Sequence, residues 1–102
     1  MNKKILTTRE ISDAVDQILR KKYHLNRIFL YGSYSKDRAK QSSDVDLIVL
    51  DEEVPKGMKF LQMISDMETV LDKSVTIQAA KYFKREEEKK LLEEIMETAK
   101  EI

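Results

Sequence analysis

Apolar residues recur along the chain with two different spacings, and these spacings predict its elements. In residues 8–22 they return every three or four positions, as on one face of a helix. The same spacing is found in residues 56–71 and again from about 84 to 102. Thr7 and Glu10 match a capping box, so the first helix is expected to begin directly after Thr7.

Short apolar runs rich in branched and aromatic residues predict three buried strands. They cover residues 27–31, 45–50 and 74–78. A short helix is expected at residues 33–38, directly behind the first strand, and the polar residues 39–43 predict a loop. The resulting order, α-β-α-β-α-β-α, predicts a small α/β domain whose helices cover a sheet of three or four strands.

Composition narrows the class of protein. The 102 residues predict one domain, 1–102, and 19 basic against 19 acidic residues argue against disorder driven by net charge. The absence of cysteine excludes disulfides and thiolate chemistry, and the single histidine, His24, excludes a histidine-rich zinc site. No apolar run has the length of a signal peptide or a membrane span, so we expect a soluble, cytoplasmic protein.

The balanced total hides a division of charge along the chain. Residues 1–41 hold ten Lys or Arg against four Asp or Glu, whereas residues 42–102 hold nine against fifteen. Such a division is often only solvated surface. It also places basic beside acidic groups, which suits phosphate and metal chemistry.

The segment between the first two predicted strands carries the candidate chemistry. Gly32 and Ser33 end the first strand, and Asp44 and Asp46 open the second after the ten residues 34–43. Gly32 lets backbone approach a ligand closely, and Ser33 adds a hydroxyl at a predicted helix start, where N–H groups favour phosphate. Carboxylates two apart on a strand leave the same face. Two such oxygen ligands can hold Mg²⁺ while substrate phosphates complete its shell.

Three cations lie between the two halves of this motif, where they can neutralise a triphosphate: Lys36, Arg38 and Lys40. A Gly-Ser pair or an Asp-x-Asp pair alone is more often a turn or a solvated strand edge. Their joint occurrence on a strand-turn-strand frame is far more specific. It predicts phosphoryl or nucleotidyl transfer, in which positioning and electrostatics supply nearly all of the catalysis.

The segment resembles the signature of the DNA polymerase β-type nucleotidyltransferase superfamily, in its minimal nucleotidyltransferase (MNT) branch. The matching positions are Gly32, Ser33, Ser43, Asp44, Asp46 and Leu47. The resemblance covers nearly the whole chain and implies a polymerase β-like mixed sheet, dependence on Mg²⁺, and ATP or another NTP as substrate. It assigns nucleotide binding to Gly32, Ser33, Lys36 and Ser43, and catalysis and metal binding to Asp44 and Asp46.

Members of the MNT branch often pair with a small helical HEPN protein of the ribonuclease-toxin type. The resemblance therefore implies an antitoxin that transfers a nucleoside monophosphate to a hydroxyl of its partner, as a homo- or hetero-oligomer. No membrane and no direct nucleic-acid binding is expected. One alternative is a catalytically degenerate domain that neutralises the HEPN protein by contact alone. A weaker one is transfer to a small molecule such as an aminoglycoside.

Two positions depart from the family pattern. Asp37 stands where the family usually has glycine, and its carboxylate would repel a triphosphate if it pointed inward. Thr76 stands where the family has a third carboxylate on a later strand, and a hydroxyl neither carries charge nor serves as a strong base. By strand alternation, Thr76 is expected to share a face with Asp44 and Asp46 if the last strand lies beside the second. The departures predict reduced or lost transfer, with nucleotide or metal binding retained.

Other residues have simpler interpretations. We expect Tyr31 in the core, Tyr34 partly exposed and His24 at the surface. Three methionines of the helix at residues 56–71 are expected in the core: Met58, Met63 and Met67. The apolar stripe of residues 91–102 is expected to close the core, with a partner-docking face over its last two turns as the alternative.

Overall fold

The computed structural model describes residues 4–102, and helices and strands alternate along them. Helix α1 (Thr8–Ala14) continues into the π-helical segment η1 (Val15–Lys22), followed by β1 (Ile28–Tyr31), a short 3₁₀ turn η2 (Gly32–Tyr34) and β2 (Val45–Val49). The second half contains α2 (Met58–Leu71), β3 (Val75–Ala79), the 3₁₀ turn η3 (Ala80–Tyr82), α3 (Glu86–Thr98) and β4 (Lys100–Glu101). No helix among these residues is long and apolar enough to cross a membrane.

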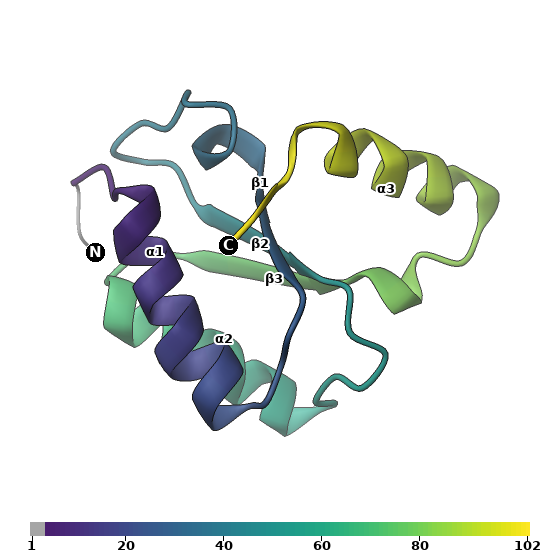
Figure 1. Ribbon diagram of the computed structural model, residues 1–102, viewed down its shortest axis with the longest axis horizontal. Coiled ribbons are helices and arrows are strands. Elements are labelled where there is room, and N and C mark those ends of the chain that lie inside the picture. The colour runs from purple at the N-terminus through teal and green to yellow at the C-terminus, as the bar shows by residue number, and fades with distance from the viewer. Residues whose placement is uncertain (1–3) are drawn as a thin grey trace.

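The strands form one mixed sheet in the order β3-β2-β1-β4. Strand β1 is antiparallel to both β2 and β4, whereas β2 and β3 are parallel. The sheet predicted from sequence, with three to four strands and mixed directions, is therefore confirmed. Figure 1 shows α1 and α2 together on one side of the sheet and α3 on the other.

The hydrophobic core lies between the sheet and the pair α1–η1 and α2. Alternate strand residues such as Leu30, Leu47 and Ile77 are buried on this face. Met63 and Met67 of α2 are fully buried against them, as expected. Met58 is 80% exposed, so its expected core position is wrong. It is the first residue of α2 and lies outside the helix's inward face.

The C-terminal segment differs from the predicted helix over residues 84–102. Helix α3 ends at Thr98, and Lys100 and Glu101 pair with Leu30 and Phe29 of β1. This pairing satisfies backbone groups along an edge of β1 that would otherwise lack partners. Of the stripe expected to close the core, Ile102 packs against it. The helix itself does not close the core, because no residue of α3 is buried and Leu91 is 48% exposed.

The partly buried carboxylate of Asp66 links the end of η1 to α2. Asp66 accepts hydrogen bonds from Lys22 Nζ at 2.7 Å, Tyr23 Oη at 2.6 Å and Gln62 Nε2 at 2.8 Å. These donors, Lys22 first, lower the pKa of Asp66 from 3.8 to about 2. The ionised carboxylate is therefore favoured in the folded state.

Replacing Asp66 should change the pH dependence of the free energy of unfolding. Because the folded-state pKa of Asp66 is depressed, its contribution is fully present above about pH 4 and is lost as the pH falls through about 2. Asp66→Asn should therefore be less stable than wild type at neutral pH, and the two should converge towards pH 2. Urea unfolding across this range measures the difference, with the exposed Glu53→Gln as control. Parallel pH profiles for wild type and Asp66→Asn would contradict the role given to this carboxylate.

Candidate functional site

A row of three polar side chains crosses the sheet on the face opposite the α1–α2 core. Asp46 of β2 pairs with Tyr31 of β1 on one side and with Thr76 of β3 on the other. Residues directly paired in a sheet project from the same face. Thr76 therefore lies where strand alternation predicts, beside Asp46. Asp44 precedes β2 by one residue and is exposed at the same end of the sheet.

The two halves of the motif meet where Gly32 lies against Asp46. Gly32 has φ +73°, and a Cβ built on it would overlap Asp46 Oδ2 and lie 3.3 Å from Asp46 Cγ. The Asp46 carboxylate thus occupies the space that a side chain at position 32 would fill. Only glycine meets both requirements, the positive φ and the close approach.

The electrostatics of Asp46 suit a cation. Burial raises the pKa of Asp46, the negative charge of Asp44 raises it further, and a hydrogen bond from Thr76 acts in the opposite direction. A divalent cation between the two carboxylates would relieve both costs, so these residues fit Mg²⁺. Within residues 4–102 no three acidic or histidine side chains form a metal-binding group. A metal here would draw its other ligands from substrate phosphates and water.

The turn after β1 is shorter than the helix predicted over residues 33–38. The 3₁₀ turn η2 ends at Tyr34, and the Ser33 carbonyl accepts from the N–H groups of Lys36 and Arg38. A three-residue turn has little helix dipole. Phosphate binding at this turn would therefore rest on individual N–H groups, the Ser33 hydroxyl and the exposed Lys36.

Asp37 points away from the carboxylates. Its φ is +55°, a conformation that glycine adopts freely and aspartate tolerates. Its side chain is 89% exposed and lies 3.8 Å from Lys100 Nζ, an ion pair at the surface. The departure from glycine at this position therefore meets a backbone requirement and does not bring a negative charge into the site.

Ser43 shapes the loop that leads into Asp44. Its hydroxyl accepts from the Lys40 N–H at 2.8 Å, and its own N–H donates to the Lys40 carbonyl at 3.0 Å. Lys73 supports the same loop from beneath, since its ammonium is buried and donates to the Gln41 carbonyl at 2.7 Å. Sequence reasoning missed Lys73, because lysine is ordinarily exposed and no local pattern marks this one.

The two tyrosines exchange their expected places. Tyr34 is buried, and its hydroxyl accepts from the Leu6 N–H at 3.3 Å. Tyr31 is half-buried on the site face, and its hydroxyl accepts from Gln78 Nε2 at 3.0 Å. Burial and the nearby charge of Asp46 raise the pKa of Tyr31, so the phenol stays protonated. The antiparallel pairing of β1 with β2 is the signal that places Tyr31 beside Asp46.

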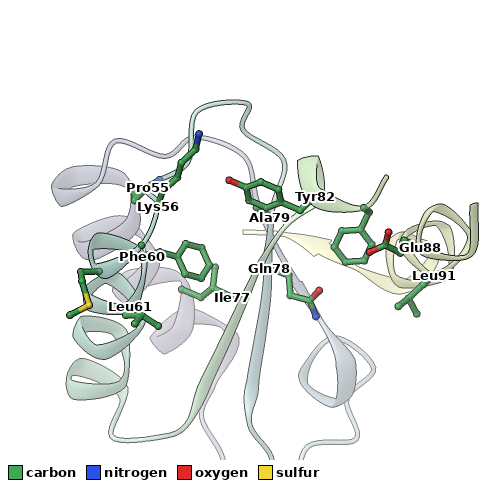
Figure 2. Close-up of a pocket in the computed structure, with 13 residues that line it drawn as sticks. Pro55, Lys56, Phe60, Leu61, Ile77, Gln78, Ala79, Tyr82, Glu88 and Leu91 are labelled. Carbon is green, nitrogen blue, oxygen red and sulfur yellow. The ribbon is translucent and has the colours of Figure 1, made fainter. Parts of the chain in front are cut away.

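A large groove runs along the edge of β3, one of the two outer strands of the sheet within residues 4–102. Its volume is about 950 Å³, and we call it the β3 groove (Figure 2). The residues that line it include Phe60, Leu61, Gln78, Tyr82, Phe83 and Leu91. Figure 2 shows Phe60 and Ile77 on one side of β3, and the Gln78 amide directed to the other side, where Glu88 and Leu91 lie.

Comparison with known proteins identifies a family whose profile matches most of the chain. The profile of the family described as "Polymerase beta, Nucleotidyltransferase" matches residues 13–102. The protein adenylyltransferase MntA of Thermococcus cleftensis is 36% identical over 70 residues, which are 66% of this chain and 71% of that protein.

Two solved structures share the fold. A crystal structure of a toxin–antitoxin with AMP-PNP matches with a TM-score of 0.71 and 21% identity, over 94% of this chain and 72% of the other. The toxin–antitoxin MntA–HepT matches with a TM-score of 0.67 and 15% identity, over 93% and 70%. At these identities the likeness shows the arrangement of helices and strands.

The contact between Gly32 and Asp46 predicts a matched pair of glycine variants. Gly32 and Gly57 both have positive φ, but a Cβ at Gly57 meets nothing within 4 Å. Gly57→Ala should therefore cost only backbone strain, ~1–3 kcal/mol for a sparsely populated conformation. Gly32→Ala should cost more and should also displace the Asp46 carboxylate, so that Mg²⁺-dependent ATP binding is lost. Urea unfolding and calorimetry measure the two effects. Equal losses of stability with intact ATP binding would show that this contact does not shape the site.

Proposed function

The chain belongs to the polymerase beta, nucleotidyltransferase family, and we propose that it transfers AMP from ATP to a hydroxyl of a small helical HEPN partner, as the antitoxin of the pair. The observation that carries the proposal is the contact between the Gly32 backbone and the Asp46 carboxylate. It brings together the turn that we propose binds phosphate and a carboxylate of the pair that we propose binds metal. The relative named protein adenylyltransferase MntA and the MntA–HepT fold neighbour support the choice of reaction and partner.

The proposed reaction is a displacement at the α-phosphorus of ATP. The acceptor oxygen forms a bond to the α-phosphorus as the bond to the bridging oxygen breaks, and pyrophosphate leaves with the electron pair. Asp44 and Asp46 would hold Mg²⁺, which supplies charge stabilisation to the phosphates. Backbone at Gly32 and the Ser33 hydroxyl bind phosphate oxygens, and the exposed Lys36 adds positive charge.

The proposed reaction also needs a base to take the proton of the acceptor hydroxyl. Thr76 is the register partner of Asp46. We assign to it the position where the family resemblance implies a third carboxylate. General-base assistance is typically worth ~10²–10⁴-fold in rate. Transfer should therefore be slow, with the proton passing to Asp46 or to solvent.

A second function rests on the same observation. With Thr76 beside Asp46, the domain would bind nucleotide and metal and neutralise its HEPN partner by contact, without transfer. Both functions keep the Mg²⁺ and nucleotide site. They differ in whether AMP becomes covalently attached to the partner.

A labelling experiment separates the two functions. Purified protein, its HEPN partner, Mg²⁺ and ATP labelled on the α-phosphate should yield labelled partner. Asp46→Asn should abolish the label because one metal ligand is lost, whereas the exposed Asp13→Asn on α1 should not. A stable but unlabelled complex would favour neutralisation by contact. Label that persists in Asp46→Asn would refute the assignment of the metal site.

Thr76→Asp tests the missing base. A carboxylate there would stand beside Asp46 and accept the acceptor proton, so transfer to the partner should rise by ~10²-fold or more. Without metal the variant should be less stable than wild type, because a third negative charge joins Asp44 and Asp46. The rate of label transfer and the melting temperature measure these effects. Thr69→Asp, at an exposed position of α2, is the control. Rapid transfer by wild type with no gain from Thr76→Asp would place the base elsewhere.

A further inference from the structure

The Tyr31–Gln78 hydrogen bond joins the carboxylates to the β3 groove. Tyr31 is the register partner of Asp46, and its hydroxyl accepts from Gln78 Nε2 at 3.0 Å. Gln78 lies two residues beyond Thr76 and projects from the same face of β3. The bond therefore passes from β1 across β2 to β3. Gln78 also lines the groove, so the pair connects the carboxylates on the sheet face with the groove.

The Tyr31 hydroxyl retains a donor. A phenol carries one proton and lone pairs on its oxygen, and the Gln78 amide uses a lone pair. Within residues 4–102 no side chain or backbone group accepts the phenol proton. The Gln78 bond holds the oxygen in place and leaves this proton available to a ligand that binds over the sheet.

The surfaces linked by the Asp46–Tyr31 pairing, the Tyr31–Gln78 bond and the groove lined by Gln78 follow the order of the groups in a nucleoside triphosphate. Asp44, Asp46 and the Gly32 turn form the charged end, suited to metal-bound phosphates. Tyr31 and Gln78 form the polar middle. The β3 groove, with Phe83 and Leu91 among its lining residues, forms the apolar end (Figure 2). A nucleoside triphosphate has the same order of groups: charged phosphates, a polar sugar and a flat, largely apolar base.

We propose that the Tyr31 hydroxyl, held by Gln78, donates a hydrogen bond to a ribose hydroxyl of the bound nucleotide, whose base occupies the β3 groove on the side of α3. This inference rests on the proposed nucleotide site and adds to it a sugar-specific contact. Tyr31 is then a residue that selects ribonucleotides over deoxyribonucleotides, and Leu91 contributes to the base site.

Calorimetry with four ligands tests the ribose contact. Wild type, Tyr31→Phe and Tyr34→Phe are titrated, with Mg²⁺, against ATP, its 2′-deoxy and 3′-deoxy analogues, and inorganic triphosphate. A single lost hydrogen bond is worth ~0.5–1.5 kcal/mol, or about 2- to 12-fold in affinity. Wild type should bind one deoxy analogue more weakly than ATP by this factor. Tyr31→Phe should weaken ATP by the same factor, leave triphosphate unchanged, and no longer distinguish ATP from that analogue.

Tyr34→Phe is the matched control, because its hydroxyl is buried and accepts from Leu6 N–H away from the carboxylates. It should lower stability without changing discrimination between the nucleotides. If Tyr31→Phe weakens ATP and triphosphate alike, or keeps the discrimination of wild type, the ribose contact is refuted while the nucleotide site stands. If wild type binds neither ATP nor triphosphate in the presence of Mg²⁺, the proposed function itself fails.

A second pair of variants tests where the base lies. Leu91 and Val70 are 48% and 50% exposed, so polar substitution of either should leave the fold intact. Leu91 lines the groove, whereas Val70 on α2 lies outside it. Leu91→Gln should weaken ATP several-fold and leave triphosphate unchanged, and Val70→Gln should change neither. If Leu91→Gln and wild type bind ATP with equal affinity, the proposal that the base occupies the groove is refuted.

Discussion

The register between β1 and β2 is the constraint on which the rest of the site depends. Leu30 and Leu47 are paired and fully buried on the core face, so their neighbours Tyr31 and Asp46 must project from the other face. A slip of one residue would turn Asp46 into the core and expose Leu47. The same register sets Asp46 over Gly32 at the end of β1. Burial of two leucines therefore positions a carboxylate that makes no contact with them.

The sheet order then decides what surrounds that carboxylate. Strand β3 runs parallel beside β2 and brings Thr76 next to Asp46, with Gln78 two residues further on. Strand β4 pairs with the other edge of β1, so β3 and the two-residue β4 are the two outer strands of the described sheet. The β3 groove opens along the edge of β3. A largely apolar groove thus adjoins the polar row of Tyr31, Asp46 and Thr76 through Gln78.

Sequence pattern predicted the larger elements well and the local details poorly. The helix and strand spacings of α1–η1, α2 and the three longer strands are strong, because each buries one face. The two-residue strand β4 has no such pattern. It is held by the open edge of β1, by the ion pair of Glu101 with Arg27 and by the packing of Ile102 against the core. Tyr31 and Tyr34 look alike in sequence, and strand pairing alone decides which faces the site. Lys73 could not be found, because its role depends on a loop that returns over it from another part of the chain.

The two departures from the family pattern carry different weight once their surroundings are known. Asp37 fills a position with positive φ and projects towards Lys100, so the backbone shape is kept without charge in the site. Thr76 removes a possible base from the row that holds Asp46. The cost of burying Asp46 beside Asp44 nevertheless remains, and folding alone would be better served by a neutral residue. A ligand that carries positive charge would offset this cost, and this supports the proposed metal site independently of the rate of transfer.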